Sequence, residues 1–72
     1  MSALTKLTAD MPEREAKPLL DAYNLVLTRL GLMDRDDPLT LMIGKRVMKV
    51  ARSGVMEPNA IAEQVLRDFP AN

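Results

Sequence analysis

The sequence contains no cysteine and no histidine. Without cysteine the chain cannot form disulfides, thiolate metal sites or a cysteine nucleophile, and nothing indicates an oxidising compartment. Without histidine it lacks the commonest general base, the serine–histidine pair and the most frequent transition-metal ligand. We therefore expect a cytoplasmic protein that is not an enzyme and that uses no cofactor and no metal.

Aromatic residues are scarce, at 3% of the chain, so the core must be built from aliphatic residues and the six methionines. No apolar stretch approaches the roughly 18 residues of a membrane span, and residues 1–10 lack the apolar run of a secretory signal. Ten Lys and Arg residues balance ten Asp and Glu residues. A net charge of zero gives no overall attraction for nucleic acid or for an anionic membrane, so any such binding must be local.

What the chain does contain is 47% hydrophobic residues in a length of 72, which suits one small folded unit and not two. Its apolar residues recur at helical spacing, and no segment alternates as a strand does. The periodic segments are separated by two acid–proline steps and two glycines: Asp37-Pro38, Glu57-Pro58, Gly31 and Gly54. The sequence predicts an all-α three-helix bundle, one domain over residues 1–72, in which residues 1–10 are flexible or form a short additional N-terminal helix.

The first predicted helix runs from about Pro18 to Leu30. Its apolar residues repeat at spacings of three and four on one face: Leu19, Leu20, Tyr23, Val26, Leu27 and Leu30. Upstream, Asp10 and Glu13 have the spacing of a capping box, which would start a helix near Met11. Because Pro18 would then remove an interior hydrogen bond, we expect a kink or a break near Lys17.

The second predicted helix runs from about Pro38 to Ser53, with Asp37 as its N-cap. Residues spaced about 100° apart form an inward stripe: Leu39, Ile43, Val47, Val50 and Ala51. Three more residues, Leu41, Gly44 and Met48, form an adjoining flank, and Met42 lies at the far edge. Since this apolar surface exceeds one face, the helix is expected to be central in its domain or covered by a second chain.

The third predicted helix runs from about Pro58 to Phe69 and ends before Pro70. It carries a narrower apolar stripe: Ile61, Ala62, Val65, Leu66 and Phe69. The stripes centred on Tyr23, Val47 and Val65 are therefore expected to meet in one core.

Two ligand sites suggested by short motifs are excluded. Asp34 and Asp36 resemble the start of a calcium loop, but Leu39 stands where that loop needs glycine and no glutamate closes it. The Gly44-Lys45 dipeptide lies inside a predicted helix, where the backbone N–H groups are already used, so it cannot cradle a phosphate.

The flank of Leu41, Gly44 and Met48 is a candidate partner interface. Glycine in mid-helix costs about 1 kcal/mol relative to alanine, so a closely approaching backbone is expected to offset it. That backbone could belong to the first helix of the same chain or to another chain, and the sequence leaves both open. The predicted function is a small non-catalytic interaction or regulatory module that self-associates through this flank.

A run of cations without acids, Lys45, Arg46, Lys49 and Arg52, is the other notable feature, and three of them, Lys45, Lys49 and Arg52, share a face. The arrangement is typical of a helix whose charges complement its own dipole, which is the favoured interpretation. The alternative is a contact strip for phosphates or an acidic partner, as in a nucleic-acid accessory protein. Sequence-specific DNA binding by a helix-turn-helix is disfavoured, because the polar face of the third helix is neutral to acidic.

Overall fold

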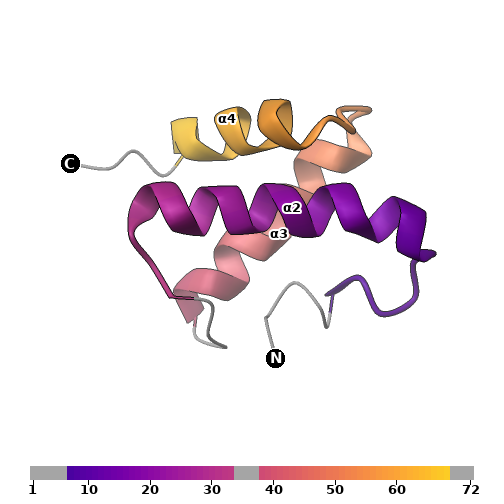
Figure 1. Cartoon of the computed structure of the whole chain (residues 1–72), viewed down its shortest axis with the longest axis horizontal. Coiled ribbons are helices and arrows are strands. Elements are labelled where there is room, and N and C mark those ends of the chain that lie inside the picture. Colours follow the sequence, from indigo (N-terminus) through magenta and orange to yellow (C-terminus); the bar gives the residue numbers. More distant parts are fainter. Residues whose placement is uncertain (1–6, 34–37, 69–72) are drawn as a thin grey trace.

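The computed structural model describes residues 7–33 and 38–68, which form three helices and no strand (Figure 1). They are α2 (Glu13–Leu30), α3 (Pro38–Arg52) and α4 (Pro58–Asp68). Helices α2 and α4 lie side by side and run in the same direction, and α3 returns diagonally across them. The predicted all-α three-helix bundle is confirmed.

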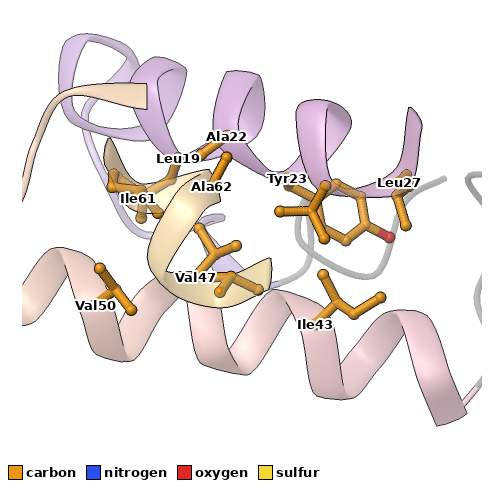
Figure 2. Close-up of a cluster of buried hydrophobic side chains, with 11 residues drawn as sticks. Leu19, Ala22, Tyr23, Leu27, Ile43, Val47, Val50, Ile61 and Ala62 are labelled. Atoms are coloured by element: carbon orange, nitrogen blue, oxygen red, sulfur yellow. The ribbon is translucent and has the colours of Figure 1, made fainter. Parts of the chain in front are cut away.

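The core lies where the three helices meet (Figure 2). Tyr23 of α2, Val47 of α3 and Val65 of α4 are each 0% exposed, so the three predicted stripes do face one another. The other fully enclosed members are aliphatic: Leu19, Ala22, Val26, Ile43, Ile61 and Ala62. With so little aromatic surface available, close packing of these small side chains has to supply the stability.

The inward face of α3 differs from the prediction at its first turn. Leu39 was expected in the core but is 42% exposed, whereas Thr40 is 2% exposed. Residues are about 100° apart around a helix, and Thr40 lies nearer than Leu39 to the centre of the arc that Ile43 and Val47 define. A short polar side chain therefore occupies the position that hydrophobicity alone assigns to leucine.

The start of α2 also differs from the prediction. Pro12, not Asp10, is the N-cap, and no side chain caps this helix end. Instead, the Pro12 carbonyl oxygen accepts hydrogen bonds from the N–H groups of Glu15 (3.0 Å) and Ala16 (2.9 Å). The predicted start near Met11 fails because a residue that precedes proline is driven out of the helical region.

Of the predicted kink or break near Lys17, the break is absent, because α2 continues through Pro18 as one helix. Proline removes one helical hydrogen bond at this point. The helix survives because Ala16 on one side of Pro18, and Leu19 and Ala22 on the other, are all buried against the rest of the chain. Tertiary packing thus outweighs the local preference.

The end of α2 agrees with the role predicted for glycine. Gly31 adopts the left-handed conformation (φ 69°, ψ 28°) and donates its N–H to the Thr28 carbonyl oxygen at 3.2 Å. The Leu32 N–H donates to the Leu27 carbonyl oxygen at 2.9 Å, which completes a Schellman motif. Five residues with predicted roles lie outside the described residues, as do residues 1–6 of the predicted N-terminal segment: Asp34, Asp36, Asp37, Phe69 and Pro70.

Glu57 caps the start of α4. Its carboxylate oxygen Oε2 accepts the Ala60 N–H at 2.8 Å, Oε1 accepts a hydrogen bond from Asn59 Nδ2 at 3.3 Å, and its backbone carbonyl accepts the Ile61 N–H at 3.0 Å. Together with Pro58 at the first helical position, this cap explains why the acid–proline step begins a helix.

Replacing Glu57 by alanine is therefore expected to lower the free energy of unfolding by about 1 kcal/mol. In a domain of this size that loss corresponds to a melting temperature lower by roughly 4–8 °C. Thermal unfolding followed by circular dichroism measures the shift, and Glu57→Gln, which keeps an acceptor oxygen, is the control. Equal melting temperatures for the alanine variant and the parent chain would contradict the capping role.

Candidate functional site

The three residues of the predicted partner interface differ in exposure. Gly44 is buried by the chain's own residues, while Leu41 and Met48 are half-buried. Met48 packs against the core cluster. The sequence left open whether the neighbour of Gly44 belongs to the same chain or to another one. The burial of Gly44 shows that contacts within the same chain are present. Leu41 and Met48 remain accessible to a partner.

Met48 also lines a hollow of about 490 Å³ on this side of α3. The hollow lies among the segment before α2, the first half of α2 and the end of α3, and most of its lining is apolar: Leu7, Met11, Leu19, Met48, Ala51 and Met56. Three exposed charged residues, Asp10, Glu15 and Arg52, complete the lining. Methionine side chains adapt to differently shaped neighbours, so this hollow suits an interaction surface.

The three cations predicted to act together keep, in the continuous helix α3, the spacing of four and three residues that places them on one side of it. Lys45, Lys49 and Arg52 are all exposed, and none of them has an ion-pair partner within the described ranges. Arg52, however, shares the apolar hollow with Asp10 and Glu15, whose negative charges offset its own. Lys45 and Lys49 instead lie together, beside a shallower hollow. Lys45 and Lys49 thus line one hollow, and Arg52, one turn from Lys49, lines another together with two carboxylates.

Arg46, the fourth cation of the run, joins α3 to α4. Its Nε lies 3.3 Å from Oδ2 of Asp68, and the two side chains are 37% and 46% exposed. A pair this accessible contributes at most about 1 kcal/mol to stability. It fixes the relative position of the two helices near their polar edge more than it holds them together.

Cations of neighbouring helices lie beside one another in three hollows. A hollow of about 330 Å³ between α3 and α4 brings Arg46 and Lys49 beside Arg67. Arg67 lines a second hollow with Arg29 of α2, and Arg46 and Lys49 line a third with Lys45. Because neighbouring hollows share residues, these side chains form one continuous surface. We call it the basic band, and it consists of Arg29, Arg67, Arg46, Lys49 and Lys45.

Sequence reasoning missed Arg29 and Arg67 because they lie on other helices, 16 or more positions from Lys45 and Lys49. Each stands alone in its own segment, so no spacing rule connects it to the run on α3. Only the antiparallel packing of α4 against α3 brings Arg67 beside Lys49.

In the two described ranges, no three Asp or Glu residues gather in a way that could hold a metal ion. None of the helices there is both long enough and apolar enough to cross a membrane. Comparison of the chain with protein-family models, with curated proteins and with solved structures gave no match.

Proposed function

We propose that this chain is a small, non-catalytic interaction module of the cytoplasm that associates with a second copy of itself. The contact surface is the flank of α3 formed by Leu41, Gly44 and Met48, extended over the adjoining apolar hollow. The observation that carries the proposal is the gathering of partly uncovered apolar side chains on this one side of α3.

The size of a stable interface requires this extension. Each partner in a typical specific complex buries about 800 Å², roughly a sixth of the 4714 Å² that this chain exposes. Leu41 and Met48 are already half-buried and cannot supply such an area alone. Leu7, Met11 and Met56 around the hollow add apolar surface directly beside them.

The charges around the hollow support a second copy as the occupant. The lining carries charges of both signs, because Asp10 and Glu15 are negative and Arg52 is positive. In a two-fold dimer the same patch of each copy meets its equivalent. A residue of the first copy that contacts a different residue of the second copy therefore makes that contact twice, once in each direction. Arg52 of each copy can then face a carboxylate of its partner.

Leu41→Asp tests the proposal. A charge on this half-buried position would have to be desolvated in the dimer, so the variant is expected to sediment as a monomer at concentrations where the parent chain is a dimer. Sedimentation velocity at tens of micromolar measures the difference. Leu41 is the position of choice because it is not among the residues packed against the core cluster, whereas Met48 is.

Met33→Asp is the matched control. Met33 is 71% exposed and lies outside the flank and the hollow, so the same charge there should leave the dimer intact. A parent chain that is monomeric at tens of micromolar, or dimers unaffected by Leu41→Asp, would refute self-association through this surface.

A further inference from the structure

The basic band lies on a surface that shares no residue with the apolar hollow or with the proposed dimer flank. The hollows along it contain five cations and only two carboxylates, Glu63 and Asp68, a local excess of three positive charges in a chain of zero net charge. Asp68 is already paired with Arg46. The other four cations, Arg29, Lys45, Lys49 and Arg67, have no ion-pair partner in the described part of the chain.

Helix dipoles account for some of these positions but not for their gathering. Arg29, Lys49 and Arg67 each stand in the last turn of their helix, where a cation is stabilised by the dipole. A cation anywhere around that last turn would gain the same stabilisation. That Arg67 lies beside Lys49 in one hollow and beside Arg29 in the next is a separate feature, and it creates a positive potential that helix dipoles do not require.

We propose that the basic band binds the phosphate backbone of a nucleic acid. The guanidinium groups of Arg29, Arg46 and Arg67 can each donate two parallel hydrogen bonds to phosphate oxygens, and Lys45 and Lys49 add point charges. Gln64 also lines the central hollow and offers a neutral hydrogen-bond donor beside the cations, whereas the Ser53 hydroxyl already donates to the Val50 carbonyl oxygen at 2.6 Å.

An acidic protein surface fits this band less well than phosphates do. Protein partners bury an apolar centre, but the exposed apolar contribution along the band comes mainly from Met42, which is 55% exposed. Interfaces with nucleic acid are more polar and far more positive. Tyr23, the aromatic residue among those that the structure describes, is 0% exposed and cannot stack on a base, so the proposed contacts are with phosphates and we expect binding that is independent of base sequence.

Salt dependence provides the test. Fluorescence anisotropy with short labelled single-stranded DNA, duplex DNA and RNA is measured for the full chain between about 50 and 200 mM salt, where backbone binders lose most of their affinity. For the double variant Lys49→Glu with Arg67→Glu, we expect at least a tenfold loss of affinity at low salt. Its plot of log affinity against log salt is expected to be shallower by about two units, one for each phosphate contact removed.

Arg14→Glu with Lys17→Glu is the matched control, because it changes the net charge by the same amount on the opposite end of α2, away from the band. It should bind as the parent chain does. Circular dichroism confirms that both double variants remain helical, and since exposed charges are exchanged in each, both should fold. Met56→Asp, which charges the apolar hollow at a side chain that is 45% exposed and outside the band's hollows, should also bind normally, so loss of the dimer and loss of nucleic-acid binding are separate outcomes.

Three results would overturn the proposal. One is the absence of binding to all three nucleic acids at the lowest salt. Another is an equal loss of affinity in the Arg14 and Lys17 control, which would mean that only overall charge matters. The third is equal or tighter binding to poly-glutamate, which would make the band a site for an acidic protein.

Discussion

Val47→Asp is expected to abolish the folded state. Val47 is 0% exposed and lies on α3, where that helix faces both α2 and α4 (Figure 2). A carboxylate at this position would lie within the hydrophobic core cluster, and burying it uncompensated costs several kcal/mol. A chain of 72 residues has little stability to lose, because the area buried by so small a core barely offsets the entropy of folding.

Far-UV circular dichroism measures this outcome directly, as loss of the helical signal at room temperature. The control is Leu39→Asp, which places the same charge on the same helix at a side chain that is 42% exposed. It should retain the helical signal. A Val47→Asp chain with full helicity would show that α3 faces the bundle with a different side from the one described.

Tyr23→Ala has the second largest expected effect. Tyr23 is the largest of the fully buried side chains, and its ring lies between α2 and Ile43 of α3 (Figure 2). Truncating a buried aromatic residue to alanine typically costs 3–5 kcal/mol, through lost burial and the cavity left behind. That is about the whole stability expected of a core of this size, so the variant should be largely unfolded.

Urea unfolding followed by circular dichroism measures the loss as a lower midpoint, or as the absence of a folded baseline. Tyr23→Phe keeps the ring and removes only the hydroxyl, so its loss should be near 1 kcal/mol. Similar midpoints for the two variants would mean that the hydroxyl, and not the packing of the ring, is what the core depends on.

Much of the fold could be predicted from the sequence because local chemistry and the hydrophobic pattern agree. Gly31 ends α2 in the left-handed conformation that glycine favours, and Glu57 with Pro58 begins α4 through an acidic cap and a preset φ angle. The stripes on α2, α3 and α4 meet as their spacing indicates. Where caps and periodicity indicate the same helix boundary, the folded structure keeps that boundary.

The prediction failed where tertiary contacts decide between local options. Pro18 interrupts a helix in isolation, but buried residues on both sides keep α2 continuous. Leu39 is more hydrophobic than Thr40, yet the direction in which α3 crosses its neighbours turns Thr40 inward. Neither the crossing direction nor the packing around Pro18 can be inferred from spacing along one helix.

The candidate site was predicted less completely than the fold. The sequence indicated Leu41 and Met48 as candidates because the apolar surface of α3 exceeds one face. It indicated Lys45 and Lys49 because they are close together in the chain. Arg29 and Arg67 join them only through helix packing. Arg52 was grouped with the lysines because side chains at helical spacing share a face, but the carboxylates beside it come from the segment before α2 and from its first turn.

The proline inside α2 has a consequence for how the helix opens. Because Pro18 has no N–H, the Arg14 carbonyl receives no bond from the residue four positions ahead, and water must solvate it. Unwinding that starts at Glu13 can therefore stop after about one turn, where this hydrogen bond is missing. Leu19, which follows Pro18, stays buried in the core. Amides before the proline should thus exchange with solvent in a low-energy local fluctuation, whereas those of the later turns exchange only when the whole bundle comes apart.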